Sequence, residues 1–358
     1  MKSIFIQSIE IENLRHLKNL RIYIDENEKK HLIITGKNGS GKSTVLEAIR
    51  GYLKSIEDNY YTMRTDSYSK MKEKEALINQ ALNERYLNNL NNLEYELNTY
   101  RECRSRYGMN IELDISNSNC VNDKFSNGNL VISYFGARRK SELIIPKGVE
   151  KIELDEKYNL DSKPANQFLK YLVDLKTQQS FARNEGEDEE ADKIGDWFNS
   201  FENSLKKLMN DDSIKLKFDY KNYNFSIIEE NKEPYGFNEL SDGYSAVLDI
   251  VMDLIMRMEK KASRAYDLQG IVLIDEVETH LHIGLQKKIM PFLTNLFPNI
   301  QFIATTHSPF VLNSIENAVI YDLEKQIKVE DLTAYSYEGI VESYFDIDQY
   351  SKQIKDKI

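Results

Sequence analysis

One loop constrains the fold of this chain more than any other feature of its sequence. Residues 36–43 read Gly-Lys-Asn-Gly-Ser-Gly-Lys-Ser, which is the complete pattern GxxxxGK[ST]. The apolar segment 31–35 leads into the loop and is predicted to be a strand, and apolar residues recur at helical spacing over 43–56. A strand, a glycine-rich loop and a helix in this order predict a phosphate-binding loop within an α/β fold.

The residue types of the loop suit the phosphate groups of a nucleotide. Its glycines let the backbone curl, so that successive N–H groups converge on phosphate oxygens, and the start of the next helix adds partial positive charge. We expect the Lys42 ammonium group to reach the β- and γ-phosphates, and the Ser43 hydroxyl to bind Mg²⁺. The residues expected to bind ATP here are Asn38, Gly39, Ser40, Gly41, Lys42, Ser43 and Thr44.

Two acidic residues follow a strongly apolar strand. Residues 270–274 read Gly-Ile-Val-Leu-Ile, which is typical of a strand buried on both faces of a parallel sheet, and Asp275 and Glu276 come next. Ligands of open α/β sheets bind beyond the carboxyl ends of the strands. We therefore expect Asp275 to lie near the loop and to hold Mg²⁺, directly or through water. Glu276 is expected to act as the general base that polarises the attacking water.

A second predicted strand, 301–305, is followed by Thr306, His307 and Ser308. A histidine at this point can contact the γ-phosphate and respond to its presence. A lone histidine is more often structural, but its place directly after a parallel strand favours the functional role. We therefore count His307 with Lys42 and Glu276 as catalytic candidates.

A short motif precedes a helix predicted over 244–260. Residues 240–244 read Leu-Ser-Asp-Gly-Tyr, and by themselves they would indicate a helix cap with Ser241 as the N-cap residue. They also resemble the LSGGQ signature of ABC ATPases. The segments IENLRHLKNLRI, GKNGSGKST, LSDGYSAVLDIVMDLIMR, GIVLIDEVETHLH and AVIYDL follow the motifs of that family in order.

The chain therefore resembles the ABC-type ATPases of the SMC, RecF and OLD-like group, often described as AAA family ATP-binding proteins. Its LSDGYS and ETHLH segments are similar to a bacterial branch that occurs in anti-phage defence and retron systems. The resemblance implies a P-loop NTPase of the α/β class, with a mixed sheet, a helical lobe and a short helical insertion. It also implies control of a separate effector protein, such as a nuclease or a toxin.

The resemblance further implies a homodimer that forms through ATP. Two copies would join head to tail around two ATP molecules with Mg²⁺. Ser241 and the Gly243 N–H group of one copy would face the γ-phosphate of the ATP held by the other copy. Hydrolysis would then remove part of the contact and bias the dimer to open.

We expect a single ABC-type ATPase domain over residues 1–358. Within it, 57–108 is predicted to be a helical insertion, because 66–106 contains no Pro or Gly. The insertion is too short for the coiled-coil arm of an SMC protein. A helical lobe is predicted over 160–212, with the acidic run 185–192 as a solvated linker between helices. The other predicted strands are 3–12, 20–25, 111–116, 129–135, 214–218 and 223–228.

The chain departs from the ABC pattern at two places. An ABC ATPase carries a Gln after the strand that ends near residue 135, and this chain has Arg138 and Arg139 there instead. A phosphate- or metal-linked role, partner binding and a solvated surface position all stay open for these arginines. His280 and His282 lie where small and acidic residues are usual. Communication across the dimer is one role for them, and half of a metal site is the less favoured one.

The overall charge excludes a uniformly basic nucleic-acid coat. The 47 Lys and Arg residues against 58 Asp and Glu residues give a formal net charge of −11, so any DNA would have to bind a local patch. The densest basic cluster is Arg101, Arg104 and Arg106, for which a solvated helix end is the more frequent outcome. The hydrophobic share of 41% provides ample apolar surface for a core and excludes a disordered acidic tail protein.

Cysteine usage and hydropathy predict a cytoplasmic protein without a membrane segment. Cys103 and Cys120 form no CxxC pair, so neither a zinc hook nor a disulfide framework is encoded. The first residues alternate apolar and polar side chains and lack the apolar core of a signal peptide. No apolar run approaches the length of about 18 residues that a membrane span needs.

No nuclease motif is visible. The histidines are His16, His31, His280, His282 and His307, and they form no HNH or RxxxxH pattern. Asp346 and Asp348 form a DxD sequence, for which a charged tail is the expected structure. We therefore expect any cutting to be done by a separate protein. Two other functions stay open, namely a RecF-like DNA-repair ATPase that acts on DNA ends or gaps, and a structural module that holds ATP with little turnover.

Overall fold

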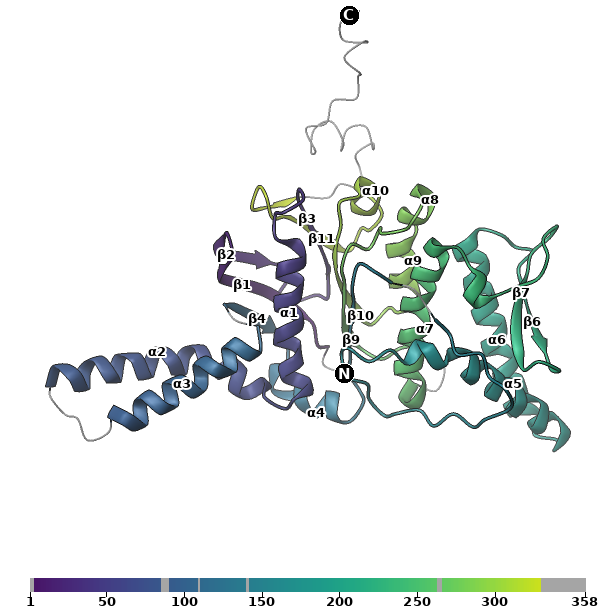
Figure 1. Cartoon of the computed structure of the whole chain (residues 1–358), viewed down its shortest axis with the longest axis horizontal. Coiled ribbons are helices and arrows are strands. Elements are labelled where there is room, and N and C mark those ends of the chain that lie inside the picture. Colours follow the sequence, from purple (N-terminus) through teal and green to yellow (C-terminus); the bar gives the residue numbers. More distant parts are fainter. Residues whose placement is uncertain (1–2, 85–89, 109, 140–141, 263–265, 330–358) are drawn as a thin grey trace, which may run out of the picture.

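The computed structural model describes residues 3–84, 90–108, 110–139, 142–262 and 266–329 (Figure 1). The strands of its central sheet are β3 (His31–Thr35), β5 (Val131–Phe135), β9 (Gly270–Ile274), β10 (Ile300–Thr305), β11 (Ala318–Asp322) and β12 (Ile327–Val329). Their order is β12-β11-β3-β10-β9-β5. All neighbours are parallel except β12, which pairs antiparallel with β11. The expected mixed sheet is confirmed.

Two smaller antiparallel sheets flank the central one. The first has the order β2-β1-β4 and the second has the order β6-β7-β8. Their strands are β1 (Ile6–Leu14), β2 (Leu17–Tyr23), β4 (Ile111–Ile115), β6 (Lys215–Asp219), β7 (Asn224–Ile228) and β8 (Tyr235–Gly236). The turn between β1 and β2 lies later than the sequence indicated, because strand pairing extends to Leu14 and Leu17. Arg15 makes this short connection with a left-handed φ of 57°.

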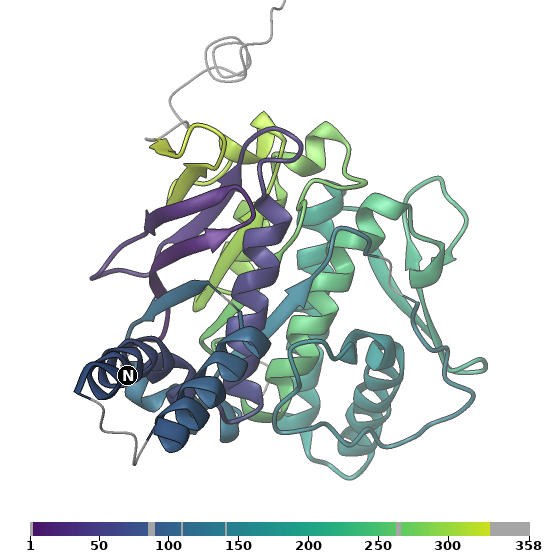
Figure 2. The same cartoon turned by 60° about the vertical axis from the view of Figure 1, so that its left-hand side comes forward.

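Helices cover both faces of the central sheet (Figures 1 and 2). Helix α1 (Lys42–Glu57) lies between the central sheet and the β2-β1-β4 sheet. The opposite face is covered by α5 (Phe168–Asn184), α6 (Asp188–Met209), α7 (Asp242–Ala262) and α9 (Ile289–Leu296). The short helices are α4 (Val121–Ser126), α8 (Ile283–Gln286) and α10 (Pro309–Leu312).

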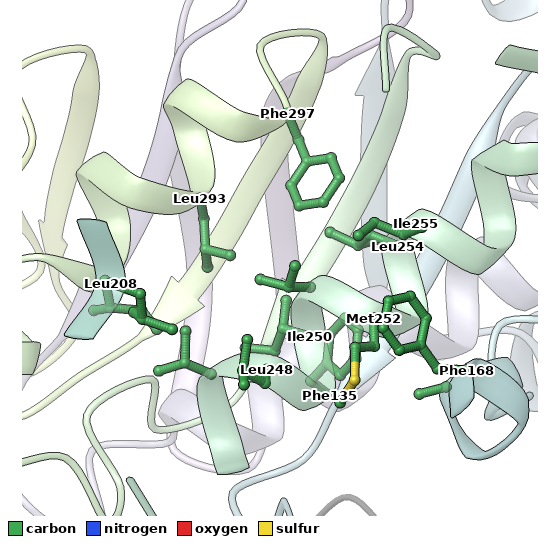
Figure 3. Close-up of a cluster of buried hydrophobic side chains, with 14 of the residues drawn as sticks. Phe135, Phe168, Leu208, Leu248, Ile250, Met252, Leu254, Ile255, Leu293 and Phe297 are labelled. Atoms are coloured by element: carbon green, nitrogen blue, oxygen red, sulfur yellow. The ribbon is translucent and has the colours of Figure 1, made fainter. Parts of the chain in front are cut away.

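The central strands divide their side chains between two cores. In β9, Ile271 and Leu273 belong to the core around α1, whereas Val272 and Ile274 belong to the core around α7. This alternation follows from the period of two residues in a strand. It explains why the segment reads as a continuous apolar run, since both faces are buried. Figure 3 shows the second core, with side chains that include Phe135, Phe168, Leu248, Leu254 and Phe297.

Helices α2 (Tyr61–Glu84) and α3 (Leu90–Arg106) form a hairpin that projects from the body of the molecule (Figures 1 and 2). They fall inside the predicted insertion 57–108, and α5 and α6 fall inside the predicted lobe 160–212. The division of the chain into these parts stays a prediction. The acidic run 185–192 is mostly helical and not a linker, because α6 begins at Asp188. Three of its acidic side chains, Asp188, Glu189 and Glu190, lie in the first turn, where the helix dipole favours negative charge.

Among the described helices, none is both long enough and apolar enough to cross a membrane. Asp346 and Asp348 lie outside the described residues.

Candidate nucleotide-binding site

The glycine-rich loop connects β3 to α1. Gly39 and Gly41 have φ values of 84° and 98°, in the region that favours glycine, so the turn depends on residues without a Cβ at these places. Asn38 and Ser40 lie in the same turn, and Thr44 lies in the first turn of α1. The Ser40 hydroxyl is buried and has no hydrogen-bond partner within the described part of the chain. A buried polar atom without a partner is a suitable contact for a ligand oxygen.

Lys42 extends over this loop. Its ammonium group donates to the carbonyl oxygens of Gly36 at 2.9 Å and Lys37 at 3.1 Å. Burial lowers the pKa of Lys42, and the nearby carboxylates of Glu278, Glu276 and Asp275 oppose this shift. The cationic side chain is therefore placed between the loop carbonyls and a group of acids at the same sheet edge.

The two predicted magnesium ligands lie side by side. The Ser43 hydroxyl donates to Asp275 Oδ1 at 3.1 Å, and Thr305 Oγ1 donates to the same carboxylate oxygen at 2.6 Å. Adjacent oxygen ligands of an octahedral Mg²⁺ ion, each about 2.1 Å from the metal, lie about 3 Å apart. A hydroxyl and a carboxylate oxygen at this separation fit the ion, so Ser43 and Asp275 are the residues that can hold it.

Glu276 begins a tight turn after β9. Its backbone is left-handed, with a φ of 45°, and its N–H group donates to Thr305 Oγ1 at 2.7 Å. The Thr279 hydroxyl donates to Glu276 Oε2 at 3.2 Å. The carboxylate thus stays on the side of the turn where it influences the pKa of Lys42 and of His307.

His307 follows β10 and faces the loop from the other side. Its imidazole forms a hydrogen bond with the backbone of Gly36. Burial and the neighbouring Lys42 lower the pKa of His307, although Glu278 and Glu276 act in the opposite direction. The structure therefore brings His307 to the same place as Lys42, Asp275 and Glu276.

Two side chains at this edge were missed by the sequence analysis. Glu278 accepts hydrogen bonds from Thr306 Oγ1, at 2.7 Å, and from the His307 N–H group. It thereby joins the turn after β9 to the turn after β10. A second carboxylate two residues beyond Glu276 was the available signal. His16, from the β1–β2 turn, lies with Nε2 3.0 Å from the Ser40 carbonyl oxygen, and no local pattern predicts this contact.

Ser241 and Gly243 lie at the start of α7, on the opposite face of the sheet from α1. A Cβ atom on Gly243 would lie only 2.9 Å from the His280 carbonyl oxygen, so the helix start packs directly against the segment that follows Glu276. The rings of Tyr244 and His282 meet edge to face, with centroids 6.2 Å apart. The motif and the two histidines therefore form one contact region.

A metal site at these histidines finds no support. Among the residues that the structure describes, no group of three or more His, Cys, Asp or Glu side chains is arranged to hold a metal ion.

Arg139 is buried beneath the acidic turn, with 6% of its surface exposed. Its guanidinium group donates to the carbonyl oxygens of Gly136, Asp275, Glu276 and Val277. A solvated surface position is therefore wrong for Arg139. Arg138 and Arg139 both line an open hollow, together with Lys163, Asp242 and His280 among other residues.

The basic cluster on α3 is neutralised by carboxylates. Arg101 pairs with Glu75 at 2.9 Å, and Arg106 pairs with Asp58 at 3.6 Å. Arg104 is buried and pairs with Glu112 and with Glu12. The structure thus gives each of these arginines an acidic partner.

A parallel sheet edge with this loop, these acids and this histidine defines a P-loop ATPase, and the Leu-Ser-Asp-Gly-Tyr helix start resembles the signature of ABC ATPases. The chain belongs to the family described as "AAA domain, putative AbiEii toxin, Type IV TA system", whose model matches residues 32–313.

Curated relatives carry names from bacterial Septu and retron systems. The chain is 25% identical to a Septu protein PtuA from Bacillus mycoides (strain KBAB4), over 96% of this chain and 45% of the relative. It is 24% identical to a Retron Vc95 probable ATPase from Vibrio cholerae serotype O1 biovar El Tor, over 90% of this chain and 75% of that protein. The chain thus spans about half the length of the Septu relative.

Among solved structures, the chain is similar to the SMC head domain from Thermotoga maritima. The TM-score is 0.41 at 12% identity, and the match covers 90% of this chain and 94% of that chain.

Proposed function

We propose that this cytoplasmic chain closes as a head-to-tail homodimer around two ATP molecules and hydrolyses them to control a separate effector protein in anti-phage defence. The observation that carries the proposal is the 3.1 Å contact between Ser43 Oγ and Asp275 Oδ1, next to Lys42, Glu276 and His307. These groups come from three strand ends at one sheet edge, where α/β proteins bind ligands.

The roles of the side chains follow from their chemistry. Lys42 exchanges its loop carbonyl contacts for the β- and γ-phosphate oxygens, while the backbone from Asn38 to Thr44 surrounds the phosphates. Ser43 and Asp275 hold Mg²⁺, which neutralises phosphate charge when it is bound. Glu276 orients the attacking water and accepts its proton. The pKa of His307 is lowered by burial, so the neutral imidazole is favoured near pH 7, and its single N–H group would exchange its Gly36 backbone contact for the γ-phosphate.

The dimer would form through the start of α7. Ser241 and the Gly243 N–H group lie at the N-terminus of a 21-residue helix, where backbone donors and the helix dipole favour an anion. The γ-phosphate of ATP bound to a second copy is that anion in our proposal. The contact of Gly243 with the His280 backbone links this interface to the turn that carries Glu276.

The effector role is supported by the relatives named for Septu and retron systems. We infer that the effector, a nuclease or a toxin, is a separate protein, because the motifs of this chain account for ATP chemistry alone. The alternative is a RecF-like ATPase that acts on DNA ends or gaps. A third alternative is a structural module that holds ATP and hardly turns it over.

Glu276→Gln tests the nucleotide cycle. The amide keeps the size of the side chain and removes the base, so we expect ATP binding to persist and phosphate release to fall by about 100-fold or more. Light scattering with ATP should show a dimer for this variant. Ser241→Arg in the same background is the matched control, which should bind ATP but remain monomeric. A mass that does not change when ATP is added to Glu276→Gln contradicts the proposal.

The effector role is tested by co-purification. We expect the product of a neighbouring gene to bind this chain and to change its activity when ATP is added. Gapped duplex DNA, added at moderate salt without a protein partner, separates the alternatives. ATP-dependent binding to this DNA, together with the absence of a nucleotide-responsive partner, would support the RecF-like function.

A further inference from the structure

The backbone of the acidic turn uses its N–H groups to bind neighbouring strands. The Asp275 N–H group donates to the Phe135 carbonyl oxygen at 2.8 Å, at the end of β5. The N–H groups of Glu276 and Val277 donate to Thr305, at 2.7 Å to its hydroxyl and at 3.0 Å to its carbonyl oxygen. Buried backbone groups need such partners, and β5 and β10 supply them for the donors of this turn.

The carbonyl oxygens of the same residues point to a different group. Arg139 donates to the carbonyl oxygens of Asp275 at 2.7 Å, Glu276 at 3.0 Å and Val277 at 3.3 Å. It also donates to Gly136 O at 2.9 Å, and so ties the segment after β5 to the segment after β9. A planar guanidinium group offers donors in a fixed fork, which the single ammonium group of lysine does not reproduce.

This arrangement sets the direction of the Glu276 side chain. Glu276 has a left-handed backbone, which is strained for a residue with a Cβ atom and persists only where its surroundings enforce it. The carbonyl groups on both sides of the Glu276 Cα atom, those of Asp275 and Glu276, are bound to Arg139. Rotation of this backbone would break both bonds and would move the carboxylate away from Thr279.

We propose that Arg139 is a positioning residue for ATP hydrolysis, which holds the turn so that the Glu276 carboxylate faces the attacking water. This inference rests on the proposed role of Glu276 as the base. Arg139 acts from beneath the turn, because both terminal nitrogens of its guanidinium group donate to backbone oxygens and its surface is buried. Its contribution therefore belongs to the rate of hydrolysis and not to the affinity for ATP.

Arg139 also interacts electrostatically with an acidic side chain of α7. Burial lowers the pKa of Arg139. Nearby carboxylates oppose this shift, and Asp249 of α7 does so more than Glu278, Asp275 or Glu276. Helix α7 begins at the Leu-Ser-Asp-Gly-Tyr motif. The residue that holds the catalytic turn is thus also close to the helix that would contact the second ATP.

Arg139→Lys is the decisive variant, because it keeps the charge and loses the fork. Displacement of a catalytic group by about 1 Å lowers rates by roughly 100-fold, so we expect kcat to fall by about that factor. The dissociation constant of ATP, measured by titration with a fluorescent analogue, should remain the same. An unchanged kcat, or a fall in activity explained by weaker ATP binding, overturns the inference.

Arg257→Lys is the matched control for a general loss of stability. Arg257 is another buried arginine that donates to backbone carbonyl oxygens, at 2.9 Å to Asn159 and 2.6 Å to Ser162, but these lie away from the acidic turn. Its variant should unfold at a lower temperature and keep the kcat of the original chain. A similar fall in kcat for both variants would show that Arg139 has only a structural role.

A double-variant comparison separates this inference from the proposed function. If Arg139 acts through Glu276, Arg139→Lys should change single-turnover phosphate release in the original chain and have no further effect in the Glu276→Gln background. An additive loss overturns the inference. Full activity of Glu276→Gln alone would instead refute the role of Glu276. If Arg139→Lys does not fold, Arg139→Gln, which retains a planar donor group, is measured in the same way.

Discussion

Two buried arginines, Arg64 and Arg139, hold two different regions of this molecule. Arg64 lies at the base of the α2–α3 hairpin and is completely buried. It donates to both carboxylate oxygens of Glu112, at 2.9 and 3.0 Å, and to backbone carbonyl oxygens that include those of Tyr107 and Gly108. Arg139, at the nucleotide edge, donates to backbone carbonyl oxygens around Asp275 and Glu276.

The difference lies in the groups that each arginine holds. The carboxylate of Glu112 compensates the charge of Arg64 at a site that joins the projecting hairpin to β4. Arg64 therefore stabilises the attachment of the hairpin to the rest of the molecule. Arg139 binds the backbone of two candidate functional residues, Asp275 and Glu276. Its position therefore affects the placement of the side chains proposed for ATP hydrolysis. The comparison predicts that changes at the nucleotide edge alter activity with little loss of stability. Changes at the hairpin base should do the reverse.

The largest effect is expected at the nucleotide edge itself. Lys42→Ala removes the ammonium group that lies over the loop, together with its charge-assisted contacts to phosphates. We expect ATP binding to become undetectable by calorimetry, while the thermal unfolding temperature of the nucleotide-free chain remains close to that of the original. ATP binding by this variant at the original affinity would contradict the assignment of the loop.

At the hairpin base we expect the opposite result. Arg64→Met leaves Glu112 without one of its two arginines, and it leaves the Tyr107 carbonyl oxygen without its side-chain donor. Breaking a buried ion pair in this way costs about 3–5 kcal/mol of unfolding free energy. Denaturant titration measures this loss, and ATP turnover per folded molecule should stay unchanged. A large fall in turnover at full stability would remove the distinction between the two regions.

The two regions also differ in how far the sequence predicted them. The loop at 36–43 and the acids at 275–276 follow from local patterns, since each pattern contains both the element and the functional residue. The structure places Ser43 against Asp275, across 232 residues of sequence, because both follow parallel strands of one sheet. The roles of these residues in hydrolysis stay predictions.

The contacts of Arg139 and Glu278 could not be predicted in the same way. Arg139 donates to the Asp275 carbonyl oxygen, 136 residues away in the sequence. No periodic sequence pattern predicts a hydrogen bond from a side chain to a distant backbone oxygen. Glu278 is one carboxylate among many, and only the packing of β9 beside β10 places it next to Thr306. The charge of the acidic run at 185–192 favours a linker, whereas the first buried apolar residue of α6 is Ala191, near the end of that run.

A pH effect of intermediate size is expected at the opposite end of β3. His31 is buried, its Nδ1 atom accepts a hydrogen bond from the Phe302 N–H group at 3.0 Å, and burial lowers its pKa to about 3. The unfolded chain binds a proton here below about pH 6.5, whereas the folded chain does so only near pH 3. Stability should therefore be complete above pH 6.5 and fall as the pH is lowered toward 3.

His31→Gln tests this pH dependence, because its amide oxygen can accept the same hydrogen bond without titrating. Denaturant titrations between pH 4 and 7 should show a smaller loss of stability for this variant than for the original chain. Equal slopes for the two proteins would show that other groups cause the acid sensitivity. Turnover at neutral pH should differ little, since His31 lies at the start of the strand and the nucleotide edge lies at its end.

The smallest effect is expected on the surface of the hairpin. Arg101 and Glu75 are both about half exposed, and such an ion pair contributes roughly 0.2–1 kcal/mol. Arg101→Ala should therefore change the unfolding free energy by less than Arg64→Met does, and it should leave ATP turnover unchanged.

The variant also tests the hairpin as a DNA contact, because a phosphate-binding arginine contributes to the salt dependence of affinity. We expect the binding of gapped duplex DNA, measured by fluorescence anisotropy over a salt series, to be the same with and without Arg101. A lower affinity and a shallower salt slope for the variant would show that this arginine contacts phosphate despite its pairing with Glu75, and would favour the RecF-like alternative.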